Sequence, residues 1–309
     1  MDFSATYRQS VTAITNATAV KNFTTRYGWR LGAKRFIAGT SFQEALPVIR
    51  NLEAEGKLVV LDLLGEFIDD EGAARQIGLD IQQAVQAATE AGVVPYFSVK
   101  PTQLGLGISY ELALELSRGV MEVVAAGGGH LCLDMESVEY VDTTIKLYEA
   151  LHTEYGNAVS TVLQSYLFRT KDDLAGILER TDAPTLRIVK GAYNESPDDV
   201  WKDIPSIIES YEDMVLMLAK AGGHVNVATH DERLIRQMIA LLKGAEIPND
   251  QFEIQLLYGV KPGLQKKLVD EGYNVRVYLP FGADWYGYFT RRLAERPENL
   301  LFVVRGLFG

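Results

Sequence analysis

Eight short runs of β-branched and other apolar residues recur along the chain, and a longer segment of helical periodicity follows most of them. Their starts lie between 24 residues (251 to 275) and 39 residues (185 to 224) apart, which is room for one strand, one helix and two loops. This alternation is typical of βα units around a parallel sheet. The runs are Leu58–Leu64, Val93–Val99, His130–Met135, Val159–Gln164, Thr185–Val189, His224–Thr229, Gln251–Leu257 and Val275–Leu279.

The segments between these runs carry signals of helices and of their ends. Residues 71–91 and 231–243 have a clear helical period. Four glycines, Gly92, Gly222, Gly244 and Gly272, stand where a helix is expected to end. Eight consecutive βα units favour a closed (β/α)₈ barrel, because an open doubly wound sheet needs a switch point and usually a glycine-rich first turn. We therefore predict an α/β chain folded as a TIM barrel with N-terminal helices.

The chain shows no linker that would divide it. Its 309 residues contain 47% hydrophobic residues, and no Gly/Ser/Pro-rich tract interrupts them. We expect residues 1–57 to form a helical segment packed on the barrel, and residues 58–309 to form the catalytic barrel.

The charge balance restricts the partners. Thirty Lys and Arg against 41 Asp and Glu give a net charge of −11, which opposes nucleic acid as the main partner. No apolar run reaches the roughly 18–20 residues of a transmembrane helix, and the start lacks the features of a signal peptide. We expect a cytoplasmic protein without a transmembrane segment.

Several common catalytic motifs are missing from the sequence. Cys132 is the only cysteine and lies in an apolar run, so we expect a buried, inert thiol. The four histidines are scattered and form no His-x-x-x-His pair, so no metal site is predicted. Neither a phosphate-binding Gly-x-x-x-x-Gly-Lys-Ser/Thr loop nor a Gly-x-Ser-x-Gly elbow occurs.

Polar residues stand where the predicted strands end, which is where TIM barrels carry their chemistry. A charged side chain inside a strand is costly to bury unless a partner compensates it. The polar residues at the strand ends could form a structural ion-pair network or an active site. Because they all gather at one end of the predicted barrel, the active site is favoured. They are Glu66, Lys100, Asp134, Gln164, Lys190, His230, Gln255 and Tyr278, with Arg187 inside the fifth strand.

A dense group of aromatic and charged residues follows the last predicted strand. Asp284 can cap a helix that carries Arg291, Arg292 and Glu295. Two neighbouring arginines can converge on one small anion, because guanidinium groups bind carboxylates bidentately. The alternative is a solvated helix face.

Short motifs stand at the end of each predicted strand and in the segment after the last one. They are 64–66 (LGE), 98–100 (SVK), 133–136 (LDME), 163–167 (LQSYL), 187–193 (RIVKGAY), 228–230 (ATH), 255–259 (QLLYG) and 278–295, which ends in Arg-Arg-x-x-Glu. In this order and spacing, the motifs resemble those of the proline dehydrogenases, from about Arg35 to Pro297. The family implies a distorted (β/α)₈ barrel.

The resemblance implies FAD-dependent oxidation of L-proline to Δ1-pyrroline-5-carboxylate in a stand-alone bacterial form. Hydride would pass from proline C5 to flavin N5, because side chains cannot accept it. A quinone would receive the electrons, which implies transient peripheral contact with a membrane. Two other interpretations stay open: a Schiff-base aldolase using Lys100 or Lys190, and a flavin or amino-acid binding module without turnover.

The same resemblance assigns roles to individual residues. Arg291 and Arg292 would hold the substrate carboxylate, and Lys100 and Asp134 would form a charged pair beside the ring. Tyr193 and Tyr278 would complete the substrate pocket. Glu66 would close it by pairing with Arg291. Asp134 and Arg187 would be catalytic, with Arg187 near flavin N5. FAD would contact Met135, Gln164, Arg187, Lys190, Gly191, Ala192, Thr229, His230, Gln255 and Glu295.

Two positions depart from the family pattern. Asn194 stands where many relatives have Trp, and Asp231 where Asn is frequent. Both are expected near the adenosine end of the cofactor, so they put the details of dinucleotide binding in question.

Overall fold

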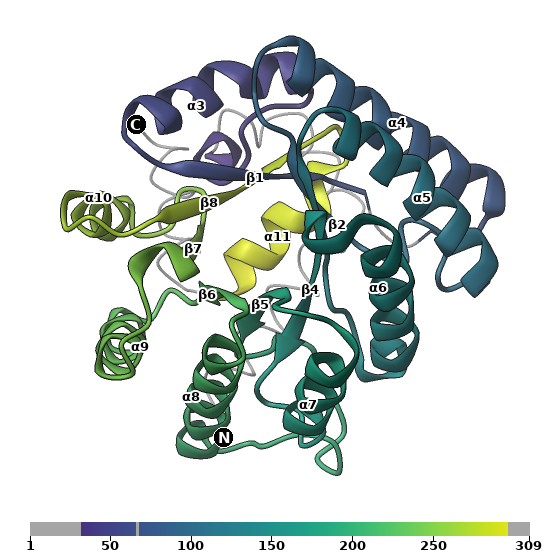
Figure 1. Ribbon diagram of the computed structural model, residues 1–309. Helices are drawn as coiled ribbons and strands as arrows, with labels where there is room; N and C mark the ends of the chain where they lie inside the picture. Colours follow the sequence, from purple (N-terminus) through teal and green to yellow (C-terminus); the bar gives the residue numbers. More distant parts are fainter. Residues whose placement is uncertain (1–31, 66–67, 296–309) are drawn as a thin grey trace.

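The chain folds around a closed barrel of eight parallel strands in sequential order (Figure 1). The computed structural model describes residues 32–65 and 68–295, the last three as backbone only. Each predicted run overlaps with one strand, although β8 extends two residues beyond Leu279, so the predicted TIM barrel is confirmed. The strands are β1 (Leu58–Leu63), β2 (Tyr96–Val99), β3 (His130–Leu133), β4 (Val159–Gln164), β5 (Thr185–Val189), β6 (His224–Ala228), β7 (Phe252–Leu257) and β8 (Val275–Phe281).

Helices surround the barrel, and the last helix departs from their ring. Figure 1 shows α11 (Trp285–Glu295) across the barrel opening. Its residues Tyr288, Arg291 and Arg292 line the same cavity as the strand ends. The other helices are α3 (Phe42–Ala54), α4 (Glu71–Glu90), α5 (Tyr110–Ala126), α6 (Val141–Tyr155), α7 (Thr170–Arg180), α8 (Ile204–Lys220), α9 (Glu232–Gly244) and α10 (Pro262–Asp270). Short 3₁₀ turns span Ala33–Arg35, Val138–Tyr140, Gly156–Ala158 and Asn249–Gln251.

Local sequence explains where these elements begin and end. Asp70 caps α4 by accepting a hydrogen bond from the backbone N–H of Ala73. The run at Val93 becomes a strand only at Tyr96, and Pro95 before it lacks the N–H that a ladder needs. Three of the four predicted helix-ending glycines have a positive φ. The prediction for Gly244 was wrong: it is the last residue of α9, and Glu246 takes the positive φ instead.

The segment before the barrel shares the barrel's core. Phe42, Ala45 and Ile49 of α3 are buried in the cluster that contains the strand residues Val60 and Leu61. Burial of such side chains stabilises by about 1.5–3 kcal/mol each. The rest of the predicted segment, residues 1–31, lies outside the described residues, so the proposed division at residue 57 stays a prediction.

The inside of the barrel is unusually polar. TIM barrels are usually filled with branched aliphatic side chains, whereas this barrel holds six polar side chains. Five of them are at most 4% exposed, and the sixth, Arg276, is half-buried. Hydrogen bonds among these side chains, and one from Asn226 to the hydroxyl of Tyr96, replace the lost hydration. Cys132 is buried as predicted. The six residues are Ser98, Arg187, Asn226, Glu253, Gln255 and Arg276.

Candidate active site

A cavity of about 620 Å³ lies between the carboxyl ends of the strands and α11. This volume is in the range of small-molecule sites. Nearly all the residues predicted for the site line it, so the structure brings them together. They are Lys100, Asp134, Met135, Gln164, Arg187, Lys190, Gly191, Ala192, Tyr193, Thr229, His230, Gln255, Tyr278, Arg291 and Arg292. Glu66 and the side chain of Glu295 lie outside the described residues.

Asp134 is the centre of the charged group at the base of this cavity. Its Oδ1 accepts hydrogen bonds from Ser98 Oγ at 2.6 Å and from Arg187 Nη1 at 2.7 Å. Its Oδ2 accepts from Tyr278 Oη at 2.8 Å and from Lys100 Nζ at 3.3 Å. Four donors therefore fix both carboxylate oxygens: Ser98 and Lys100 from β2 and its end, Arg187 from β5 and Tyr278 from β8.

These contacts determine the charge states. Burial alone would raise the pKa of Asp134, but Lys100 and Arg187 outweigh it and lower that pKa. Burial alone would lower the pKa of Lys100, yet Asp134 and Asp62 raise it above its ordinary value. Burial, reinforced by Asp134, raises the pKa of Tyr278. At neutral pH the group therefore holds an aspartate anion, a lysine cation and a neutral tyrosine.

Arg187 reaches from β5 into the middle of the barrel. Its Nε donates to Gln255 Oε1 at 2.6 Å, and its Nη1 also donates to Ser98 Oγ at 3.1 Å. Its guanidinium carbon lies 5.4 Å from the centre of the Tyr278 ring. The remaining nitrogen, Nη2, is buried with no hydrogen-bond partner among the described residues. A buried donor of this kind needs an acceptor, which a bound molecule or an ordered water can supply.

The far side of the cavity is formed by the ends of β4 to β7. Gln164 Nε2 donates to the carbonyl of Glu136 at 2.9 Å. His230 Nε2 accepts from the N–H of Leu257 at 3.0 Å, which leaves Nδ1 as the protonated nitrogen of a neutral ring. Lys190 pairs with Asp231 at 3.4 Å. Asp231 also caps α9, which Asn could do as well, but only Asp supplies the charge for Lys190.

Gly191 lets the loop after β5 pass very close to a tyrosine. Its φ is +115°, and a Cβ at this position would lie 2.2 Å from Cδ1 of Tyr166. Only glycine fits both the dihedral and the space. The loop continues to Tyr193, whose pKa is raised to about 12 by burial of its hydroxyl, although the residue as a whole is 40% exposed.

The two arginines reach the cavity from α11. Arg291 is exposed and Arg292 is half-buried, and the guanidinium carbon of Arg292 lies 5.1 Å from the centre of the Tyr288 ring. Trp285, Tyr288 and Phe289 anchor the helix against Phe36 and Ile37. This apolar contact fixes where the arginines stand.

Sequence reasoning missed several residues of the cavity, notably Asp62, Thr102, Glu136 and Tyr288. Asp62 is buried in β1 and raises the pKa of Lys100. The sequence did contain a sign of this role, because Asp62 is a charged residue inside the apolar run Leu58–Leu64. Glu136 accepts hydrogen bonds from the N–H and the hydroxyl of Thr102 at 2.9 and 2.7 Å, and nothing in the sequence indicated this contact.

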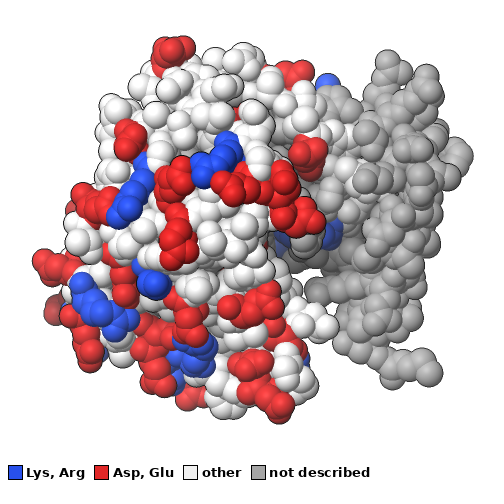
Figure 2. Space-filling view, turned by 90° about the vertical axis from the view of Figure 1, so that its right-hand side faces the viewer, with Lys and Arg blue, Asp and Glu red and all other residues white. Residues whose placement is uncertain are grey.

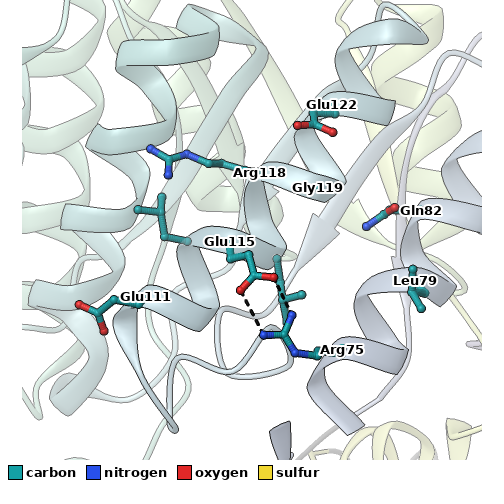
Figure 3. Close-up of a pocket in the computed structure, with 10 residues that line it drawn as sticks. Arg75, Leu79, Gln82, Glu111, Glu115, Arg118, Gly119 and Glu122 are labelled. Atoms are coloured by element: carbon teal, nitrogen blue, oxygen red, sulfur yellow. Dashed lines mark hydrogen bonds and ion pairs between the residues drawn. The ribbon is translucent and has the colours of Figure 1, made fainter. Parts of the chain in front are cut away.

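A second hollow, of about 730 Å³, lies on the outside between α4 and α5 (Figure 3). Its Arg75 is paired with Glu115 at 2.6 Å and with Glu71 at 2.8 Å. Acidic groups predominate on this side of the molecule, with basic groups between them (Figure 2). Exposed pairs of this kind contribute little energy, and the cationic groups are already neutralised. The hollow therefore lacks the convergent charges of the barrel cavity.

The described residues contain neither a membrane-spanning helix nor a cluster of metal-binding side chains. No helix in residues 32–65 and 68–295 is long and apolar enough to cross a membrane. The same residues hold no cluster of three or more His, Cys, Asp or Glu side chains that could bind a metal ion.

Comparison with known proteins gives full-length relatives. The chain is 40% identical to a proline dehydrogenase of Deinococcus radiodurans over 97% of both chains. It is 37% identical to proline dehydrogenase 1 of Bacillus subtilis, covering 94% of this chain and 95% of that protein. Proline utilization A of Bdellovibrio bacteriovorus has a similar fold, with a TM-score of 0.78 at 24% identity over 84% of this chain and 32% of the longer one.

A family comparison agrees with these relatives. The sequence profile described as proline dehydrogenase matches residues 45–305, a range that contains every residue predicted for the site. The chain belongs to the proline dehydrogenase family.

Proposed function

We propose that this enzyme oxidises L-proline to Δ1-pyrroline-5-carboxylate with FAD, and that its electrons pass to a quinone. The observation that carries the proposal is the position of Arg291 and Arg292 over a cavity whose base holds Lys100, Asp134 and Arg187. The arginine pair can bind a carboxylate. The charged groups at the floor of the cavity can stabilise charge that changes next to them during the reaction. Relatives named proline dehydrogenase support the substrate.

The cavity fits a flavin by three observations. The buried Nη2 of Arg187 lacks an acceptor among the described residues. Gly191 lines the cavity with backbone atoms alone, because a side chain there would collide with Tyr166. Gln164, Thr229 and His230 add polar groups along one wall. We propose that these residues hold FAD together with Met135, Lys190, Ala192, Gln255 and Glu295. When bound, FAD supplies the two-electron acceptor that side chains lack.

The arginines act as the clamp for the substrate carboxylate in this proposal. Each charged hydrogen bond contributes about 1.5–3 kcal/mol. Tyr193 and Tyr278 line the same cavity. In this proposal they shield the bound ring from water. Together they hold the small ring in one orientation, which lowers the entropy that the reaction must lose.

Lys100 and Asp134 orient charge beside the substrate. The raised pKa of Lys100 keeps it an ammonium ion, and this cation favours the neutral amine of proline over a second cation nearby. Asp134 holds Lys100, Arg187 and Tyr278 by direct hydrogen bonds. Its role is therefore to fix three groups in position, and the lowered pKa makes it a weak base.

Arg187 supplies a fixed positive charge near the cofactor in our proposal. Both partner contacts of its Nη1 and the bond from its Nε hold the guanidinium in one place. A positive charge set in place before the reaction stabilises negative charge that develops close to it. We therefore expect Arg187 to raise the reduction potential of the cofactor.

The electron acceptor is the part of the proposal that rests on family likeness alone. A quinone in a membrane requires transient peripheral contact, and the face around α4, α5 and α6 is rich in acidic groups (Figure 2). Acidic groups repel anionic lipid headgroups. We therefore propose that any membrane contact uses a different face.

The aldolase interpretation meets an obstacle in the structure. A Schiff-base lysine must be neutral to attack a carbonyl. Lys100 has a raised pKa and an aspartate partner, which keep it charged. Lys190 is paired with Asp231.

The test is proline-dependent reduction of a soluble quinone analogue by the purified protein, with trapping of the imine product. We expect turnover with L-proline. An incubation with carbonyl substrates and borohydride is the matched test of the alternative. Absence of quinone reduction, together with a lysine covalently trapped by borohydride, would replace the oxidation by aldolase chemistry.

A further inference from the structure

A continuous line of hydrogen bonds runs from the active site toward the opposite end of the barrel. From Asp134 it passes to Arg187, then from Arg187 Nε to Gln255 Oε1 at 2.6 Å. Gln255 Nε2 donates to Glu253 Oε1 at 2.6 Å. Arg276 then donates to both oxygens of Glu253, at 2.6 and 2.9 Å. Neither Glu253 nor Arg276 lines the active-site cavity.

The carboxamide of Gln255 is the one group in this line that could adopt two orientations. Its two ends have similar size and shape but opposite hydrogen-bonding character. Arg187 Nε can only donate, so it requires the oxygen end. The Glu253 carboxylate can only accept, so it requires the NH₂ end. The two neighbours therefore select the same orientation, and reversing the amide would set donor against donor and acceptor against acceptor.

Glu253 is held firmly in its charged form. It lies on β7 two residues before Gln255, so both side chains point to the same face of the strand. Arg276, opposite Gln255 in β8, forms a bidentate pair with it and donates to the carbonyl of Val59 at 2.9 Å. The Arg276 guanidinium carbon also lies 4.2 Å from the centre of the Tyr96 ring.

We propose that Glu253 is a positioning residue of the flavin site: it fixes the orientation of the Gln255 amide and, through it, the place of the Arg187 guanidinium. The inference rests on the proposed function, since it takes Arg187 to lie beside the flavin. Glu253 is expected to touch neither substrate nor cofactor. Its effect reaches the site through two hydrogen bonds.

The test compares the flavin reduction potential of the loaded wild type with that of Glu253→Gln. A neutral amide at 253 can donate or accept, so the preference for one Gln255 orientation is lost. We expect a more negative potential, because Arg187 then stabilises the reduced flavin less. Loss of the partners that orient metal ligands typically costs about 10–100-fold in activity, and the lower end of that range is the guide for this indirect contact. We expect the rate of flavin reduction to fall by about tenfold, while KM for proline and flavin content stay unchanged.

A double variant separates this role from simple stabilisation of the barrel. With Gln255→Met, the link between position 253 and Arg187 is gone, so adding Glu253→Gln should not shift the potential further. Tyr96→Phe is the matched control: it removes a buried hydroxyl that accepts from Asn226 at 3.2 Å in the same part of the barrel, and it should leave the potential unchanged.

The unpaired Arg276 in Glu253→Gln could prevent folding. The double substitution Glu253→Gln with Arg276→Met removes both charges, and it should show the same shift of potential. A wild-type potential in a folded Glu253 variant would overturn the inference, as would a full shift that persists with Gln255→Met. A wild type that binds flavin and oxidises proline in the same experiments keeps the proposed function intact, whereas a wild type without flavin removes both.

Discussion

Arg187 and Asp134 stand 53 residues apart in the sequence, yet Nη1 of one lies 2.7 Å from Oδ1 of the other. Their side chains are 5% and 13% exposed. Removing one partner of a buried pair leaves an uncompensated charge and typically costs about 3–5 kcal/mol. A substitution of either residue should therefore both destabilise the barrel and displace groups of the active site.

Lys100 and Asp134 are expected to act as one unit. Asp134→Ala and Lys100→Ala should each reduce proline oxidation, and the double variant should lose much less than the sum, because each single change already breaks the pair. A double-mutant cycle on kcat/KM measures this. Additivity within about 0.5 kcal/mol would remove the pair from the mechanism.

Arg291→Met and Arg292→Met should weaken proline binding and leave FAD in place. Loss of two to three kcal/mol of charged hydrogen bonding corresponds to a fall in kcat/KM of about 10². Steady-state kinetics and the flavin content provide the measurement. Arg236→Met, on the outer helix α9 and paired with Glu271, is the control and should retain wild-type kinetics. An unchanged KM in both α11 variants would mean that the carboxylate binds elsewhere.

Gly191→Ala should lower the affinity for FAD. The substitution places a methyl group 2.2 Å from Tyr166 and requires an unfavourable φ, a strain of about 1–3 kcal/mol. The ratio of flavin to protein after dialysis reports the loss. Gly244→Ala serves as the control, because a Cβ there meets no atom within 4 Å. Full retention of flavin in Gly191→Ala would show that this loop does not carry the cofactor.

Stability should decline on mild acidification because of His130. Burial, with a contribution from Arg276, lowers the pKa of His130 to about 3, against about 6.5 for an unfolded chain. The unfolded state therefore binds the extra proton between these values, so stability is complete above about pH 6.5 and is lost as the pH falls toward 3.

Urea unfolding at several pH values measures this decline. Between pH 6.5 and 5 we expect a loss on the order of 1 kcal/mol. His130→Gln should flatten the profile in that window. Parallel profiles for wild type and variant would assign the acid sensitivity to other groups, such as the buried carboxylates at lower pH.

Glu66 lies outside the described residues, and its role as a gate stays a prediction. Glu66→Ala should preserve FAD binding but reduce turnover, because an ion pair with Arg291 would close the pocket and exclude water. Stopped-flow reduction by proline would measure the change. Wild-type kinetics would leave Glu66 as an ordinary rim carboxylate, worth less than about 1 kcal/mol.

The regular part of the fold was readable from the sequence because βα units repeat locally. Strand runs and helix caps such as Asp70 depend on near neighbours. The positions of site residues at strand ends followed from the barrel rule. The polar barrel interior was not predicted, because Arg276, which pairs with Glu253, and Tyr96, which pairs with Asn226, lie on other strands and depend on register. Asp62 was visible as a charge in an apolar run, but its proximity to Lys100 required the closed barrel.

The most direct test of the account is an anaerobic titration of the purified holoprotein with L-proline. We predict a yellow protein whose flavin absorption bleaches in proportion to the proline consumed, with one equivalent of Δ1-pyrroline-5-carboxylate formed for each flavin reduced. A protein that carries flavin but does not bleach with proline would contradict the claim that one cavity holds both the cofactor and the substrate.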